Sequence, residues 1–257
     1  MCLILFANEA NSRYRLVLAA NRDESYSRPT APAAFWEEAP NVLAGRDLKG
    51  GGSWLGVTRS GKIAAVTNFR GSDKVWEGAP SRGNLVSDFL MSSESPDVYI
   101  DTLRARARHY NGFNLLLGSN QGLWWYSNRY DEQPQRIIPG IHGLSNYLLD
   151  TPWPKVERGK HTLEHLIVGE KEIMPEQVLP ILEDRAPAAD DELPDTGVGL
   201  ELERVLSAPF IRTQHYGTRS STVLLIEHTG SVTFVERSFN PRYESQKETR
   251  YKFRIKP

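Results

Sequence analysis

The chain has 257 residues, of which 39% are hydrophobic and 25% are charged, and its formal net charge is −1 at pH 7. These proportions are ordinary for a globular domain, and the balanced charge gives no electrostatic footprint for nucleic acid. The sequence has neither a signal peptide nor a run of ~20 apolar residues for a membrane span, and its single cysteine excludes an internal disulfide. We therefore expect one cytoplasmic domain over residues 1–257.

The N-terminal part is predicted to contain strands. Residues 2–8 and 15–21 are apolar runs separated by a polar turn, and the second run is apolar on both strand faces. A strand with two apolar faces is covered on both sides by other layers. The Pro-rich stretch 25–41 is too polar and too broken for regular structure, so we expect a loop there.

The rest of the chain alternates between hairpins and helices. Hairpins are predicted over 54–69, 113–128 and 221–238, and helices over 82–91, 96–109, 155–168, 174–184 and 200–207. The acidic segment 186–199 indicates a mobile surface loop, and the basic tail 250–256 indicates an edge strand. Because hairpins rather than single strands alternate with helices, the pattern favours an α+β fold of two antiparallel sheets between helices.

The only cysteine stands at position 2, directly behind Met1. One interpretation is packing, since a free cysteine behaves as a small hydrophobic residue within the run 2–6. The other is catalysis. If Met1 is removed, Cys2 carries a thiol and a free α-amine, which is a nucleophile with its own base. We expect Met1 to be removed, because Cys2 is small.

Two motifs favour structural interpretations. The glycine run 50–52 matches neither phosphate-binding pattern and indicates a strained turn into the strand near Trp54. The sequence HTLEH over 161–165 matches an inverted zinc-peptidase pattern, with His161 and His165 on one helix face. That face lies nearly opposite the apolar stripe of the helix, so we expect a solvated surface and no metal site.

The densest polar cluster follows the second predicted strand. If that strand continues, Asn21 and Asp23 lie on one face, and Arg22 and Glu24 lie on the other. Arg22 would then share a buried apolar face and need a partner for its charge. The alternative is that the strand ends at Asn21 and the charges form a solvated turn.

Three further polar residues end or begin buried strands. Asn68 and Asn146 each follow an apolar run, where a neutral amide can stabilise an oxyanion or simply form a turn. Arg219 stands at the entry of a buried strand, where it can hold a carboxylate or phosphate bidentately or form a surface ion pair.

Seven stretches together resemble the NRDE family, also called the Transport and Golgi organisation protein 2 family. They are MCLILFA, LVLAANRDESYSRPT, LAGRDLKGGGSWLGV, AAVTNFR, SRGNLV, HGLSNYLLDTPWPKV and YGTRSSTVLL, in order from residue 1 to about 226. The resemblance implies the four-layer αββα sandwich of N-terminal nucleophile hydrolases. That fold agrees with the pattern of hairpins and helices.

A more distant resemblance to the cysteine amidases of that fold implies roles for single residues. Cys2 would be the nucleophile, Asn68 and Asn146 oxyanion or positioning donors, and Arg219 a further site residue. An Arg and an Asp of the second strand would lie beside the cysteine. In those amidases the two stand three residues apart, whereas Arg22 and Asp23 are adjacent here. Either a bulge turns one of them toward the site, or only one of them acts.

The sequence supports two candidate functions almost equally well. The first is a cysteine amidohydrolase or thioesterase acting on a small acyl compound, with no cofactor required. The second is a carrier of haem or an acyl lipid that uses the same cleft. The six tryptophans would support the carrier if they lined a pocket, although core packing explains them equally well. A zinc peptidase is the disfavoured third interpretation.

Overall fold

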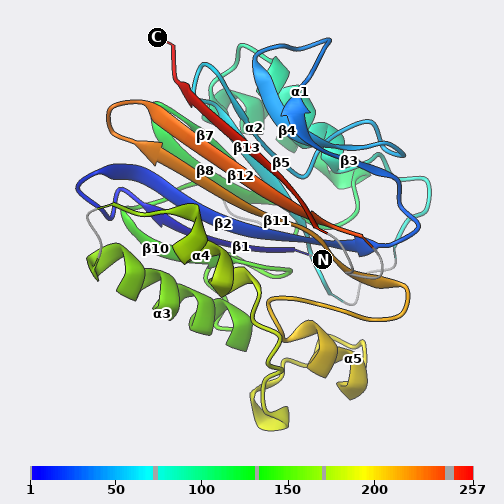
Figure 1. Cartoon of the computed structure of the whole chain (residues 1–257). Coiled ribbons are helices and arrows are strands. Elements are labelled where there is room, and N and C mark those ends of the chain that lie inside the picture. The colour runs from blue at the N-terminus through cyan, green and yellow to red at the C-terminus, as the bar shows by residue number, and fades with distance from the viewer. Residues whose placement is uncertain (1, 72–74, 131–132, 170–171, 241–245, 257) are drawn as a thin grey trace. The chain divides into compact units, whose positions relative to one another are not determined.

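The structure is a computed structural model, and it describes residues 2–71, 75–130, 133–169, 172–240 and 246–256 (Figure 1). The chain divides into two compact units, each with one β-sheet and its own helices. Unit 1 comprises Met1–Ser27, Pro139–Ser145 and Leu149–Lys252, and unit 2 comprises Arg28–Ile138, Asn146–Leu148 and Phe253–Pro257. Within the described residues, no helix is both long and apolar enough to cross a membrane.

The sheet of unit 1 has six strands in the order β10-β1-β2-β11-β12-β13. The strands are β1 (Cys2–Asn8), β2 (Tyr14–Ser25), β10 (Gly140–Leu144), β11 (Tyr216–Glu227), β12 (Ser231–Phe239) and β13 (Gln246–Arg254). The helices are α3 (Pro154–Gly169), α4 (Pro175–Leu182) and α5 (Leu200–Leu206), with a short 3₁₀ helix at Asp190–Glu192. The basic tail is thus an edge strand, as predicted.

Helices α3 and α4 pack on one face of this sheet (Figure 1). The shared core comprises Leu3, Leu5, Val17, Ala19, Val223 and Leu225 of the strands with Val156, Leu163, Ile167, Val178, Leu179 and Leu182 of the helices. A Cβ added to Gly159 would lie 2.4 Å from Leu5 Cδ1, so this glycine lets α3 approach β1 closely. In β2, Leu16, Leu18 and Ala20 alternate with Val17 and Ala19 and are also buried, which confirms that this strand is covered on both faces.

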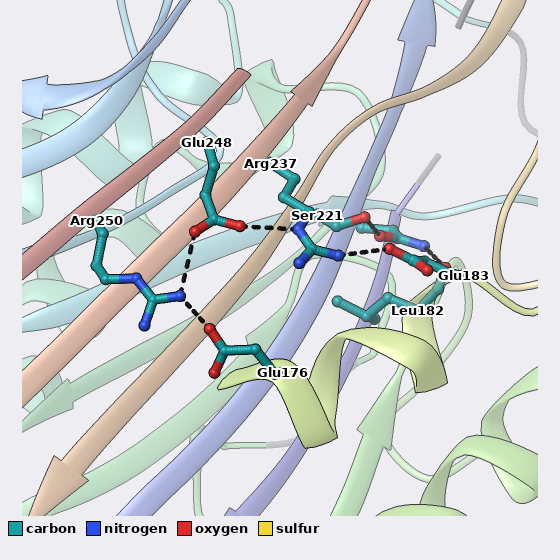
Figure 2. A network of polar contacts seen from close by, with 8 residues as sticks. Glu176, Leu182, Glu183, Ser221, Arg237, Glu248 and Arg250 are labelled. Atoms are coloured by element: carbon teal, nitrogen blue, oxygen red, sulfur yellow. Dashed lines mark hydrogen bonds and ion pairs between the residues drawn. The ribbon is translucent and has the colours of Figure 1, made fainter. Parts of the chain in front are cut away.

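A network of ion pairs joins α4 and the residue that follows it to strands β12 and β13 (Figure 2). Arg237 donates from Nε to Glu248 Oε2 at 2.9 Å and from Nη1 to Glu183 Oε1 at 2.9 Å. Arg250 donates to Glu248 Oε1 at 3.1 Å and also to Glu176. These side chains are partly exposed, so each pair adds little stability and the network mainly fixes the orientation of α4.

The sheet of unit 2 has seven strands in the order β3-β4-β5-β6-β7-β8-β9. The strands are β3 (Thr30–Phe35), β4 (Val42–Asp47), β5 (Leu55–Thr58), β6 (Ile63–Asn68), β7 (Phe113–Ser119), β8 (Gly122–Ser127) and β9 (Gln135–Arg136). The helices are α1 (Gly83–Met91) and α2 (Pro96–Arg104), with a 3₁₀ helix at Ala107–His109. Helix side chains such as Phe89 and Leu103 pack with Leu115 and Leu117 of β7 in one core.

Most predicted elements are present, and two predictions are wrong in part. The stretch 25–41 is not wholly irregular, because β3 forms at the edge of its sheet around Pro32, where its pairing with β4 is interrupted. The helix predicted over 96–109 ends at Arg104 and is followed by a 3₁₀ turn. Four of the six tryptophans, Trp36, Trp54, Trp125 and Trp153, are buried, in line with core packing.

Candidate functional site

Cys2 begins β1 in unit 1 and lies opposite Arg22 of β2 in the antiparallel pairing. Paired residues on neighbouring strands project to the same face, so thiol and guanidinium share one side of the sheet. The cysteine is half-buried, and its carbonyl oxygen accepts a hydrogen bond from Ser145 Oγ at 3.1 Å. Met1, whose removal the sequence predicts, lies outside the described residues.

Strand β2 continues through the whole charged cluster. Asn21, Arg22 and Asp23 are 1%, 6% and 2% exposed, which shows that a solvated turn is the wrong interpretation. The reason is tertiary: β11 pairs with β2 as far as Ser25, so these polar residues lie inside a sheet. Glu24 is half-buried, and its Oε1 accepts a hydrogen bond from the Ser25 amide at 2.8 Å.

Asn21 lies on the helix-covered face and serves the fold. Its Nδ2 donates to the carbonyl oxygens of Leu182 at 2.8 Å and Pro209 at 2.9 Å. Its Oδ1 accepts from Ser221 Oγ at 2.6 Å. Both ends of this buried amide are therefore satisfied by the protein, as a buried polar group requires.

Asp23 lies on the same face as Asn21, in a cluster that includes a buried cation. Its Oδ1 accepts from Thr218 Oγ1 at 2.7 Å, and its carbonyl oxygen accepts from Tyr216 OH at 2.8 Å. Burial raises the pKa of Asp23, while the positive charges of Lys155 and Arg22 oppose that rise. Lys155 is only 2% exposed and begins α3. Lys155 therefore supplies charge compensation for a buried carboxylate.

A bulge is present, but in the strand beside β2. The pairing of β11 with β2 shifts between Thr218 and Ser220, so Arg219 is the extra residue. Arg219 Nη1 donates to the carbonyl oxygen of Ser25 at 2.9 Å. Because the pairing of β2 with β1 has no shift, Arg22 keeps the face of Cys2 and Asp23 keeps the other face.

The pKa of the Cys2 thiol is raised, and burial is the largest cause. The negative charge of Asp23 adds to the rise, whereas the Asp23 backbone amide and the Arg22 charge lower the pKa. A nearby cation lowers the pKa of a cysteine, and a catalytic cysteine commonly uses this effect. The loss of hydration on burial outweighs the attraction of one guanidinium.

Unit 2 brings the predicted asparagines together. Asn146 Nδ2 donates to the carbonyl oxygen of Asn68 at 2.9 Å, and the Arg70 amide donates back to the Asn146 carbonyl at 2.6 Å. Asn114 is fully buried, and its Nδ2 donates to Thr67 Oγ1 at 3.1 Å and to the Tyr147 carbonyl at 2.8 Å. We refer to Asn68, Asn114 and Asn146 as the amide cluster.

The glycine run 50–52 forms a turn and the HTLEH histidines lie at the surface, as predicted. A Cβ on Gly52 would lie 2.3 Å from the carbonyl carbon of Gly83, so the glycine run lets a turn approach the start of α1. His161 and His165 are exposed, and their Nε2 atoms are 3.0 Å apart. Among the described residues, no group of three or more His, Cys, Asp or Glu side chains could hold a metal ion.

Sequence reasoning missed Lys155, Thr218, Tyr216 and Asn114. Lys155 could have been found, because it is one turn before Gly159 and two turns before Leu163 on the buried stripe of α3. Asn114 stands in an otherwise apolar strand, β7, which is also a visible signal. Nothing in the stretch 216–219 indicates that a bulge would place the hydroxyl of Thr218 against Asp23.

Sequence comparisons find a family model and relatives that cover most of the chain. A family model described as Transport and Golgi organisation 2 matches residues 1–241. The Homo sapiens Transport and Golgi organization protein 2 homolog is 36% identical over 275 residues, covering 99% of each chain. The Drosophila melanogaster Transport and Golgi organization protein 2 is 29% identical, covering 93% of this chain and 92% of that protein.

One solved structure supports the fold. A Caenorhabditis elegans N-acylethanolamine-hydrolyzing acid amidase ortholog matches with a TM-score of 0.50 at 10% identity, covering 88% of this chain and 92% of that chain. At this identity the likeness concerns the fold alone. It is consistent with the predicted sandwich, and the α+β class with two antiparallel sheets is confirmed.

Proposed function

Because the chain belongs to the Transport and Golgi organisation 2 family, and because Cys2 lies opposite a buried arginine, we propose that it is a cysteine hydrolase of the N-terminal nucleophile type. Its substrate is a small acyl amide or thioester. The observation that carries the proposal is the Cys2–Arg22 pair at the start of β1, where a lone cysteine lies beside a buried arginine. A cytoplasmic location fits a chain with one cysteine.

Because the pKa of the Cys2 thiol is raised, the proposed reaction requires a base. A neutral thiol must lose its proton as the sulfur attacks the carbonyl carbon, so a base has to be adjacent. Removal of Met1 supplies that base as the α-amine of Cys2, whose ordinary pKa is about 7.7–8.0. The amine takes the thiol proton and later gives it to the leaving amine or thiol. Water then cleaves the acyl–sulfur bond and releases the acid.

Asn68 and Asn146 are the proposed donors to the oxyanion, and Arg219 is the proposed contact for an anionic part of the substrate. The side chain of Asn146 already donates to the Asn68 carbonyl, so Asn68→Ala is the cleaner test of a donor. Loss of one oxyanion donor lowers kcat by about 10²–10³. We expect Asn68→Ala to lower kcat within that range.

The test compares product formation with binding. Wild type, Cys2→Ser and Cys2→Ala are assayed on N-dodecanoylethanolamine and a palmitoyl thioester, and the same compounds and haem are titrated by calorimetry. Intact mass spectrometry records whether the purified chain begins at Cys2. We expect product from wild type, little from Cys2→Ser and none from Cys2→Ala, which should still bind the substrates.

Two results would overturn the hydrolase. One is a purified chain that retains Met1, because the amine of Cys2 is then held in a peptide bond. The other is tight stoichiometric binding of haem or the acyl compound without product, unchanged in Cys2→Ala. That second result would establish the alternative function, a carrier of haem or acyl lipid.

A further inference from the structure

Ser220 has a buried hydroxyl group without a hydrogen-bond partner among the residues that the structure describes. The residue is 3% exposed, and its Oγ forms no hydrogen bond there. A buried polar atom in that state is uncommon and costs free energy, so its occurrence requires a reason. One reason is that the missing partner is a ligand atom.

The position of Ser220 indicates which ligand. Arg22 pairs with Cys2 on one side and with Ser220 on the other, so the three residues form one row across β1, β2 and β11. The row shares one face of the sheet. The neighbouring Ser221 confirms the assignment, because its Oγ bonds to Asn21 on the opposite, helix-covered face.

Distance along this row limits what Ser220 can contact. Neighbouring strands are about 4.8 Å apart, so the backbones at Cys2 and Ser220 are separated by about 10 Å. With Cys2 Sγ at a carbonyl carbon, Ser220 Oγ can reach only a group several bonds away from it. A guanidinium offers donors alone, and a hydroxyl can also donate, so Arg22 and Ser220 together suit an acceptor oxygen.

We propose that Ser220 Oγ and the Arg22 guanidinium bind an oxygen atom on the leaving group of the substrate, three or four bonds beyond the carbonyl that Cys2 attacks. This rests on the proposed hydrolase function. The substrate class is then an acyl amide or thioester with a carboxylate or hydroxyl near the scissile bond. Ser220 is a positioning residue with no part in bond cleavage.

Three probes with the same acyl chain test the proposal. N-dodecanoylglycine ends in a carboxylate, N-dodecanoylethanolamine ends in a hydroxyl, and N-propyldodecanamide has an isosteric apolar end. Affinities are measured by calorimetry for Cys2→Ala and for Cys2→Ala combined with Ser220→Ala, so no turnover interferes. We expect the second substitution to weaken binding of an oxygen-bearing probe about three- to tenfold and to leave the propyl probe unchanged. The probe whose binding is weakened shows whether the bound oxygen belongs to a carboxylate or to a hydroxyl group.

Ser221→Ala is the matched control, because Ser221 is an adjacent buried serine whose hydroxyl is bonded within the protein. We expect Ser221→Ala to lower the melting temperature and to leave the ranking of the probes intact. Ser220→Ala should leave the melting temperature unchanged or raise it by up to about 4 °C, since it removes an unsatisfied hydroxyl. In the Cys2-containing protein, Ser220→Ala should raise KM for the oxygen-bearing substrates.

Equal affinities of the three probes before and after Ser220→Ala would overturn the inference. So would a loss of stability in Ser220→Ala as large as that in Ser221→Ala, because the hydroxyl would then have a partner in the protein. Absence of product from wild type would overturn only the hydrolase. An oxygen-dependent loss in the Cys2→Ala background would still support a ligand contact at Ser220.

Discussion

Cys2 and Arg22 lie directly opposite each other in the pairing of β1 with β2, yet the pKa of the thiol is raised. The arginine is therefore insufficient to hold a thiolate at rest. Asp23, which is next to Arg22 but on the other face, acts in the opposite direction on the same thiol. Two adjacent residues of β2, Arg22 and Asp23, thus have opposite effects on the pKa of the Cys2 thiol.

The pH dependence of alkylation tests this opposition. We expect iodoacetamide to react with Cys2 at a rate that rises through an inflection above about 8.5, the value of a free cysteine. Arg22→Met should move the inflection to higher pH, and Asp23→Asn should move it to lower pH, because each removes one of the opposing charges. The urea-denatured protein gives the reference curve. An inflection near neutrality in wild type, or shifts of the same sign in both variants, would contradict this account.

Lys155 is expected to be a large contributor to stability for a charged residue. Lys155→Met removes a buried cation near Asp23 and should cost about 3 kcal/mol of unfolding free energy, the size found when one buried partner is deleted. Urea denaturation measures this, with Lys160→Met as the control. Lys160 pairs with Asp150 at 3.3 Å in a more exposed position and should cost less than about 1 kcal/mol.

The cost of Lys155→Met should also depend on pH. The folded-state pKa of Asp23 is already raised, and loss of the lysine raises it further. A raised carboxyl pKa stabilises the fold only below the unfolded value, and that stability is lost as the pH rises through the folded value. Lys155→Met should therefore be more destabilising at pH 8 than at pH 4. Equal costs at both pH values would show that Lys155 acts by packing.

Asp150 combines a strained backbone with a strongly bonded carboxylate. It has φ of 57°, its Oδ2 lies 2.7 Å from His142 Nδ1, and its Oδ1 accepts from the Gly143 amide at 2.8 Å. Burial by itself would raise the pKa of Asp150. The hydrogen bonds from His142 and Gly143 outweigh burial and hold this pKa below its ordinary value. The carboxylate therefore fixes the turn that follows β10.

Asp150→Asn keeps a residue that tolerates the left-handed conformation and removes the charge. A lowered pKa gives stability above the unfolded pKa, which is lost as the pH falls through the folded value. We expect Asp150→Asn to cost about 1–2 kcal/mol at pH 7 and progressively less as the pH falls below the ordinary carboxyl pKa. Denaturant titrations over that pH range provide the measurement, and a cost that does not change with pH would refute the electrostatic explanation.

Two glycine substitutions separate close packing from backbone freedom. Gly52→Ala places a Cβ within 2.3 Å of the Gly83 carbonyl carbon, so backbone must move, at a cost of about 1–3 kcal/mol. Gly169→Ala, at the end of α3, meets nothing within 4 Å and should be neutral or slightly stabilising. Thermal melts of both variants distinguish them. A melting temperature of Gly52→Ala within 1 °C of wild type would mean that the turn adjusts freely.

Local sequence patterns predicted the hairpins and most helices because alternation and capping are short-range signals. The hairpin around Gly61 and the helix that begins after Ser95 are examples. Strand β3 was missed because Pro32 argues against a strand, although an edge position accommodates it. The raised pKa of Cys2 was not predictable for the same reason, since burial is set by distant elements that no local pattern contains.

The sequence predicted which residues belong to the candidate site better than it predicted how they are arranged. The sequence indicated that Arg22 and Asp23 lie on opposite faces if the strand continues, and the pairing of β2 shows this arrangement, with both side chains buried. The bulge was expected in β2 as one of two alternatives, but it lies at Arg219 in β11. Which strand carries the bulge depends on how β11 pairs with β2. These two strands are far apart in the sequence, so no local pattern contains this information.

That pairing also sets an order of events during synthesis. Asp23 and Thr218 are neighbours in the sheet but are separated by 195 positions in the chain. At translation rates of 5–20 residues per second, β2 waits roughly 10–40 s for its central partner. Cys2 thus emerges from the ribosome long before the sheet that buries it can close. An enzyme that trims the N-terminus can act in that interval, before the pairing of β2 with β11 is complete.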